Sequence, residues 1–167
     1  MRRFVLLLAA ALFCLNSGCT SKPAEQPRKL KAAIVPHDVI AARLAEDMIA
    51  SLGDERPEKI FLVGPNHAAV GPKIISTHGG AAMLNGLAAA NDELIQKEHS
   101  IGNVLPFLER HLPGVEVIPV IFHKAASLDA VKKVMGLMFA ESGAVVVASI
   151  DFSHGLPPLF MKTARFS

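Results

Sequence analysis

Cysteine is nearly absent from this 167-residue sequence, and tryptophan and tyrosine are missing altogether. The two cysteines, Cys14 and Cys19, both lie close to the N-terminus. The rest of the sequence therefore has no thiol pair for a disulfide and no thiolates for a structural zinc site. A metal bound by that part of the chain must be held by histidine, carboxylate or backbone oxygen ligands.

An excess of one charge sign is also lacking. The sequence has 17 Lys and Arg against 15 Asp and Glu, which gives a formal net charge of +2. Arg2 and Arg3 belong to a short basic start, and without them the basic and acidic side chains are equal in number, at 15 each. A chain without net positive charge offers no basic surface to a phosphate backbone, so we expect no nucleic-acid partner.

The apolar run Phe4–Leu15 is shorter than the roughly 20 residues that a membrane-spanning helix needs. Together with the basic start and the small residues before Cys19, it predicts a secretory signal peptide over residues 1–18. Cleavage there would free Cys19 for lipid attachment, as in bacterial lipoproteins, so we expect an exported protein anchored to the cell membrane by lipid. Secretion to the periplasm without lipid is the alternative, because Asn16 stands where lipoprotein signals usually carry leucine.

Residues 19–31 predict a flexible linker, because the stretch is polar, holds two prolines and has no apolar periodicity. Residues 32–167 are long enough for one domain with a single hydrophobic core. Four runs in this part are rich in Val and Ile and continuous rather than alternating, which is typical of parallel strands covered on both faces. The predicted strands are Ala32–Val35, Ile60–Gly64, Val117–Phe122 and Ala144–Ile150.

Helical patterns separate the predicted strands, at Ile40–Leu52, Asp92–Leu112 and Leu128–Glu141. Pro106 is expected to break or restart the second helix, and Asp38 is expected to cap the first. The alternation of strands and helices predicts an α/β fold with a mainly parallel sheet. The segment 71–90 gives no clear pattern.

Histidines follow three of the predicted strands: His37 the first, His67 the second and His154 the last. Because catalytic groups and ligands gather at the carboxyl ends of parallel strands, we expect these imidazoles to share one site, with Asp151 beside them. Imidazole is the commonest neutral ligand of first-row metals and also an acid or base near neutral pH. Asn66, which precedes His67, is expected to hold the turn there.

A fourth histidine, His99, lies between Glu98 and Ser100 and has two interpretations. In one, Glu98, His99 and Ser100 together form the wall of a pocket; in the other, His99 is a partly exposed residue that begins a helix capped by Ser100. Three other histidines have no comparable setting and are predicted to be surface groups: His78, His111 and His123.

Five segments, read in order, resemble the successive signatures of the MEMO-like family, known in prokaryotes as AmmeMemoRadiSam system protein B. They are VPHD, FLVGPNH, KEHSIGNVLPFLE, VEVIPVIF and VVVASIDFSH, and they extend from Ala33 to His154. Members of this family are similar in fold to the class III extradiol ring-opening dioxygenases, which place non-haem iron on histidine and carboxylate ligands. The resemblance therefore implies a three-layer α/β/α fold and a metal-dependent, dioxygenase-like oxidoreductase.

Carried over residue by residue, the resemblance implies metal ligands at His37 and His67. It also implies pocket-lining residues at Asn66 and Asp151. The candidate catalytic residues are His99 and His154. The implied cofactor is a divalent metal, with iron first and zinc or copper as alternatives. We expect an unidentified small-molecule substrate and a functional association with other AmmeMemoRadiSam proteins.

The family's domain continues beyond the DFSH motif and takes a further metal ligand from that region, whereas this sequence ends at Ser167. Residues 32–167 are therefore predicted to be an incomplete MEMO-like domain, with apolar surface of the strand Ala144–Ile150 left exposed. Three functions stay open: a metal-dependent enzyme, a non-catalytic lipoprotein that binds a metal or ligand, and an inactive truncated fragment.

Overall fold

The computed structural model describes residues 30–151, which form an α/β domain around one six-stranded sheet. The strands are β1 Ala32–Pro36, β2 Lys59–Pro65, β3 Ile74–Ser76, β4 Ala89–Ala90, β5 Glu116–Phe122 and β6 Ala144–Ile150. The predicted signal peptide, the predicted lipid site Cys19 and the candidate catalytic residue His154 lie outside the described residues.

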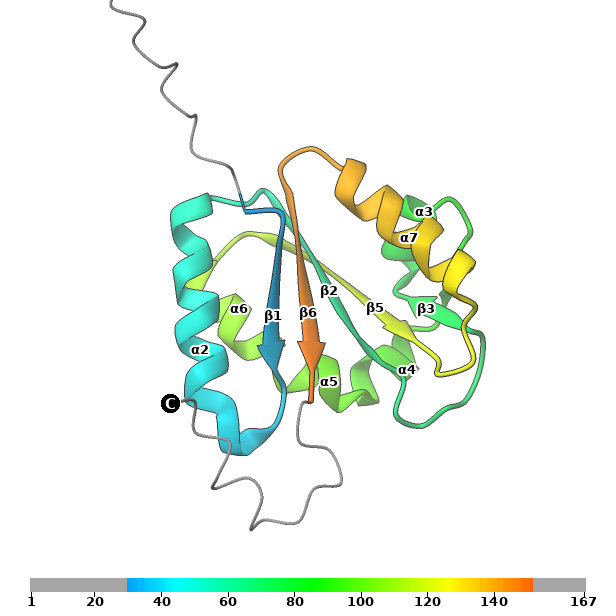
Figure 1. The fold of residues 1–167 in the computed structure, drawn as a ribbon, viewed down its shortest axis with the longest axis horizontal. Coiled ribbons are helices and arrows are strands. Elements are labelled where there is room, and N and C mark those ends of the chain that lie inside the picture. The colour runs from blue at the N-terminus through cyan, green and yellow to red at the C-terminus, as the bar shows by residue number, and fades with distance from the viewer. Residues whose placement is uncertain (1–29, 152–167) are drawn as a thin grey trace, which may run out of the picture.

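The sheet has the strand order β1-β6-β2-β5-β3-β4 and is parallel over its first four strands. The short β3 runs antiparallel to β5 and pairs parallel with β4. Val35 on β1 is in register with Ser149 on β6, so the two strands end together (Figure 1). The carboxyl ends of β1, β6 and β2 therefore meet at one edge, as the sequence predicts.

Successive residues of the central strands enter two separate hydrophobic clusters, one on each face of the sheet. On β2, Ile60 and Leu62 belong to the first cluster, and Phe61 between them belongs to the second. On β6, Val145 and Val146 divide in the same way. Side chains alternate between faces along a strand, so a run that is apolar throughout is buried only where helices cover both sides.

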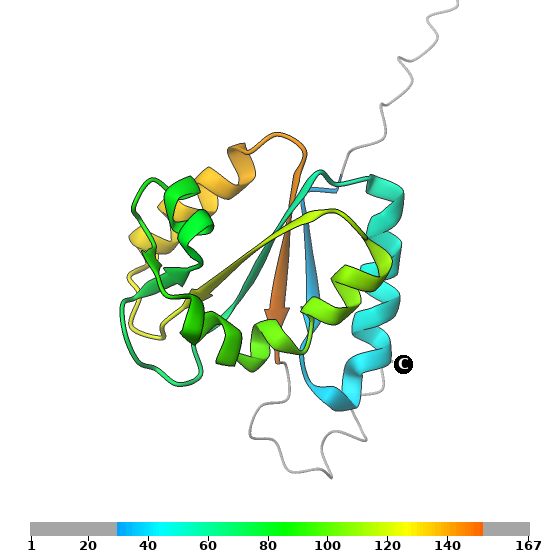
Figure 2. The same cartoon turned by 180° about the vertical axis from the view of Figure 1, so that it is seen from behind.

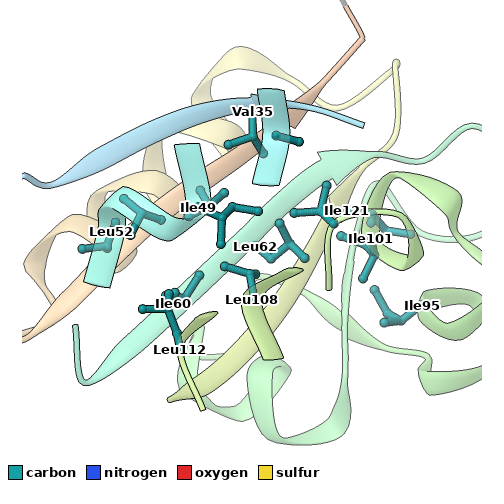
Figure 3. Packing of buried hydrophobic residues seen from close by; sticks show 14 of the residues in the cluster. Val35, Ile49, Leu52, Ile60, Leu62, Ile95, Ile101, Leu108, Leu112 and Ile121 are labelled. Carbon is teal, nitrogen blue, oxygen red and sulfur yellow. The ribbon is translucent and has the colours of Figure 1, made fainter. Parts of the chain in front are cut away.

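The helices supply these two covers, which Figures 1 and 2 show from opposite sides. The first cluster packs against α2 Ala42–Ser51, α4 Asp92–Lys97, α5 His99–Gly102 and α6 Leu105–His111, and Figure 3 shows its side chains. The second packs against α3 His78–Met83 and α7 Leu128–Ala140. The predicted three-layer α/β/α fold with a mainly parallel sheet is confirmed.

Two of the predicted helices are each divided into shorter elements in the structure. The first is split into the 3₁₀ turn η1 Val39–Ala41, then α2, then the 3₁₀ turn η2 Leu52–Glu55, and the Asp38 carboxylate accepts from the backbone N–H of Ile40 as the expected cap. The second is divided into α4, α5 and α6, with Pro106 in the first turn of α6. Proline there lacks only an N–H that the helix leaves unbonded. None of the helices among residues 30–151 has the length and apolar character to cross a bilayer.

The segment 71–90, which gave no pattern in the sequence, contains β3, α3 and β4. The strands β3 and β4 have three and two residues, which is too short for a hydrophobic periodicity to be recognised in the sequence. The expectation that Ala144–Ile150 leaves apolar surface exposed is wrong for Ala144 to Val147, which are buried because β6 lies between β1 and β2. At the end of the strand Ile150 is 37% exposed. The edge strands are β1 and β4, and Ile34 on β1 is 48% exposed.

Candidate metal centre

Three histidines meet at the edge of the sheet where β1 and β2 end. His37 follows β1, His67 lies two residues beyond β2, and His99 begins α5. One ring nitrogen from each comes within 4.8 Å of the others, close enough for a single metal ion to be held by all three. The three sequence positions are far apart, so only the parallel arrangement of the strands and the placement of α5 bring the imidazoles together.

The three rings are packed closely against one another. His67 and His99 are stacked, with ring centroids 3.9 Å apart and an angle of 27° between their planes. His37 meets both edge-on, at centroid distances of 5.2 Å to His67 and 5.5 Å to His99. Rings this close would repel one another if all were protonated, whereas neutral rings can share one cation.

His37 is buried and held by a serine on the neighbouring strand. Its Nδ1 atom lies 3.0 Å from Oγ of Ser149, and the Ser149 hydroxyl donates its own proton to the backbone oxygen of Ser100. That leaves the Ser149 oxygen as the acceptor, so Nδ1 of His37 carries the proton. The other nitrogen, Nε2, is buried and has no hydrogen-bond partner among the described residues. A buried lone pair left unpaired is costly, and a metal ion would satisfy it.

His67 is held by Glu98, the residue before His99. Its Nδ1 atom lies 2.7 Å from Oε1 of Glu98, and its backbone N–H donates to Oε2 of the same carboxylate at 2.9 Å. A carboxylate only accepts, so Nδ1 of His67 is the protonated nitrogen. A histidine backed by a carboxylate in this way is the usual arrangement of a metal-binding imidazole.

The start of α5 is pressed against the end of β2, and this places Glu98 and His99 beside His67. Ser100 is fully buried and donates through Oγ to the backbone oxygen of Pro65 at 3.0 Å. Gly64 permits this approach, because a β-carbon there would lie 2.4 Å from Oγ of Ser100. The N-cap of α5 is Glu98, which accepts from the backbone N–H of Ser100, so the prediction of Ser100 as the cap is wrong.

His99 combines both of its sequence interpretations. It begins a helix, and its side chain is 51% exposed, yet its ring also forms one wall of the cluster. Its Nδ1 atom lies 3.5 Å from Oε1 of Glu98, so one carboxylate stands behind two of the three rings.

The burial of His37 and Glu98 moves their pKa values. The pKa of His37 is below its ordinary value, first because burial disfavours the charged ring and then because the charges of His67 and His99 would repel it. Burial by itself would raise the pKa of Glu98, but hydrogen bonds from the His67 ring and from the backbone N–H groups of Ser100 and His67 outweigh it and lower that pKa. Neutral His37 and ionised Glu98 are the forms suited to binding a cation.

Asp151 follows β6 and lies near enough to His37 for its charge to oppose the lowering of the histidine pKa. Asn66 is buried between β2 and His67; its amide donates to the backbone oxygen of Val70 at 2.8 Å and so holds the turn, as expected. Its Oδ1 atom is buried without a hydrogen-bond partner among the described residues.

The remaining described histidines lie apart from the cluster. His78 is exposed and pairs with Asp92, as a surface group would. His111 is half-buried and donates to Glu46 on α2, and His123 is half-buried between the backbone oxygen of Ala69 and the N–H of Ala125. Those two join segments that are far apart in the sequence, so their prediction as surface groups is only partly right.

Ser149 was not predicted as part of the site, and Glu98 was predicted only as part of a pocket wall with His99 and Ser100, not as the partner of His67. Glu98 carried a signal, since a carboxylate directly before a candidate histidine can orient another ring. Ser149 carried none, because it lies inside an apolar strand and meets His37 only through the pairing of β1 with β6.

Comparisons with known proteins agree on one family. A family model described as Memo-like protein matches residues 81–164. A MEMO1 family protein of Aquifex aeolicus (strain VF5) is 30% identical over 162 residues, covering 83% of this chain and 59% of that protein. A MEMO1 family protein of Caldivirga maquilingensis is 27% identical over 170 residues, covering 86% of this chain and 60% of that protein.

The chain therefore spans 59–60% of the length of these two curated relatives. No solved structure matches it significantly.

Proposed function

The chain belongs to the Memo-like protein family, and from that premise we propose that it binds a divalent metal ion through His37, His67 and His99 at the carboxyl edge of its sheet. One observation carries this proposal: the buried Nε2 atom of His37 has no hydrogen-bond partner among residues 30–151, and the His37 ring lies against two more imidazoles. Three imidazoles suit iron, zinc or copper better than magnesium or calcium, which prefer oxygen ligands.

The chemical role proposed for the site is that of a metal-dependent oxidoreductase acting on a small molecule. A bound divalent metal with open coordination positions would supply activation of dioxygen, if it is iron, or of water, if it is zinc. The protein's own contribution is to orient the imidazoles and, by burial, to disfavour the charged form of His37. Glu98 and Ser149 stand behind the rings, and the exposed side of His99 leaves the site open to a substrate.

His99 can serve as the third ligand or as the acid or base, but one nitrogen cannot do both at once. Its position within the cluster favours ligation, and Asp151 and His154 are then the remaining candidates for proton transfer. The alternative function is a non-catalytic lipoprotein that uses the same histidines to bind a metal. Both functions predict the same metal affinity. Only a measurement of catalytic turnover separates the enzyme from the non-catalytic protein.

Residues 1–19 support a second proposal, that the protein is exported and attached to the cell membrane by lipid at Cys19. The basic start, the apolar run Phe4–Leu15 and the small residues before Cys19 carry it. A functional association with other AmmeMemoRadiSam proteins is proposed from the family alone.

The metal proposal is tested by titrating the chelator-treated protein with Fe²⁺ under argon, and in parallel with Zn²⁺ and Cu²⁺. One equivalent should bind, and His37→Ala, His67→Ala and His99→Ala should each weaken binding by more than about tenfold, as expected for loss of a ligand or its close support. His78→Ala is the matched control, because His78 is exposed and outside the cluster. Equal binding by the wild type and a triple alanine variant would remove the site from consideration.

A further inference from the structure

An oxygen atom stands behind Nδ1 of each imidazole in the cluster. For His37 it is Oγ of Ser149, at 3.0 Å. For His67 and His99 it is Oε1 of Glu98, at 2.7 Å and 3.5 Å. An oxygen atom thus lies beside Nδ1 of all three rings, and one nitrogen of each ring lies within 4.8 Å of the others.

From this arrangement we propose that Glu98 and Ser149 are positioning residues that hold His67 and His37 in the Nδ1–H tautomer, so that both rings offer Nε2 to a cation. The role given to these tautomers, to present Nε2 to a metal, rests on the proposed metal-binding function. The tautomers themselves are a property of the metal-free protein, and they can be observed whether or not a metal binds.

Glu98 is committed to this role by its other bonds. Its side chain is 2% exposed, and its two oxygens accept from the ring and backbone N–H of His67 and from the backbone N–H of Ser100. A buried carboxylate that accepts three N–H groups cannot rotate without leaving several of them unpaired. It therefore fixes the ring of His67 in direction as well as in tautomer.

Ser149 fixes His37 through the direction of its own proton. A hydroxyl has one hydrogen, and here it is donated to the backbone oxygen of Ser100. The Ser149 oxygen can then only accept from His37, and the opposite tautomer would set two lone pairs against each other. Ser149 is 1% exposed, so no bulk water is at hand to replace this bond.

Ser100 connects the two positioning residues. Its backbone N–H donates to Glu98, and its backbone oxygen accepts from Ser149. A single turn at the start of α5 therefore sets the tautomers of histidines that follow two different strands. A displacement of that turn would disturb both rings together.

The test reads the tautomers directly by long-range ¹H–¹⁵N NMR of the chelator-treated full chain labelled at histidine. In the wild type both His37 and His67 should be protonated at Nδ1. Glu98→Gln replaces one acceptor oxygen with a donor and should convert His67 to a mixture of tautomers, and Ser149→Ala should do the same to His37 only. Glu93→Gln and Ser51→Ala are matched controls on exposed helical positions and should change neither ring.

The same four variants are titrated with Zn²⁺ alone. Glu98→Gln and Ser149→Ala should each lose about 10–100-fold in affinity, and the two controls should keep that of the wild type. A wild-type ring protonated at Nε2, or variants with unchanged tautomers, would overturn the proposal. Should Glu98→Gln not fold, the wild-type state of His67 and the Ser149→Ala variant still decide it.

The two proposals fail in different ways. If the wild type shows both Nδ1–H tautomers, the variants shift them, and Zn²⁺ nevertheless does not bind, then the metal-binding function is wrong and the positioning stands. If Zn²⁺ binds tightly and the variants leave both the tautomers and the affinity unchanged, then the positioning is wrong and the metal-binding function stands.

Discussion

A β-carbon at position 64 would lie 2.4 Å from Oγ of Ser100, so Gly64 and Ser100 occupy space that no larger pair can share in this arrangement. The sequence predicts a strand, Ile60–Gly64, that ends at this glycine. The structure instead places it within β2, where the missing side chain lets the first turn of α5 sit against the strand. The contact brings Glu98 and His99 next to His67 and is therefore a structural requirement of the site.

Gly64→Ala should impair both folding and the site. The new methyl group would force Ser100 away from β2, and overpacking of this kind costs about 1–3 kcal/mol of unfolding free energy. The affinity for Zn²⁺ should fall as well, because Glu98 moves with Ser100. Urea denaturation and a Zn²⁺ titration measure the two effects.

Gly136→Ala on α7 is the control, since a β-carbon there meets nothing within 4 Å. It should raise the stability slightly, by about 0.5–1 kcal/mol, because alanine is favoured over glycine within a helix. If the Gly64→Ala protein matched the wild type in stability and in Zn²⁺ affinity, the close contact between α5 and β2 would not be required.

Met138→Ala should destabilise the protein by about 2–5 kcal/mol, as expected for truncation of a fully buried side chain. Met138 is 0% exposed and belongs to the cluster under α7, on the face of the sheet opposite α5. The Zn²⁺ affinity of the folded protein should therefore be unchanged. Phe139→Ala, at a 43% exposed position one residue along, should cost much less in the same urea experiment.

Glu46→Gln should make the stability less sensitive to acid. The Glu46 carboxylate on α2 accepts from His111 and Arg110 on α6, and these hydrogen bonds lower its pKa below the ordinary value of 4.5. The unfolded chain then binds the proton first, so this contribution is complete above pH 4.5 and is lost as the pH falls through the lower folded value.

The comparison is made by urea denaturation of wild type and Glu46→Gln at several pH values from 7 to about 3, the range in which carboxylates titrate. Because the Glu46 side chain is 31% exposed, solvent screens its charge, and the difference in slope should be small. Identical slopes would mean that the contact between α2 and α6 does not depend on this charge.

Cys19→Ala should release the protein from the membrane. If the thiol carries the lipid, the wild type should appear in the membrane fraction and require detergent for extraction, whereas the variant should be found in the soluble exported fraction or remain with an uncleaved signal. Cys14→Ala is the control, because Cys14 lies within the predicted signal peptide. Wild-type protein in the cytoplasmic fraction would contradict the predicted export.

The sheet was predictable from the sequence where burial is uniform. In Ala144–Ile150 every position but Ser149 is apolar, because helices cover both faces of the sheet, and the observed β6 has the predicted bounds. The helix Asp92–Leu112 was predicted less well, because its division into three parts depends on packing: α5 turns to bring Ser100 against β2. The two-residue β4 depends on its partner β3 for its existence and has no local signal.

The sequence alone determined which histidines follow which strands, and the polarity of a parallel sheet then requires His37 and His67 to share an edge. What only the tertiary structure decided is how those rings are held. Ser149 reaches His37 across 112 positions of sequence, and Glu98 reaches His67 across 31. A local pattern reports which face of an element is apolar, but a hydrogen bond depends on an atom's position to within a fraction of an ångström. That position is set by strand register and by the approach of one helical turn, which exist only once the chain is packed.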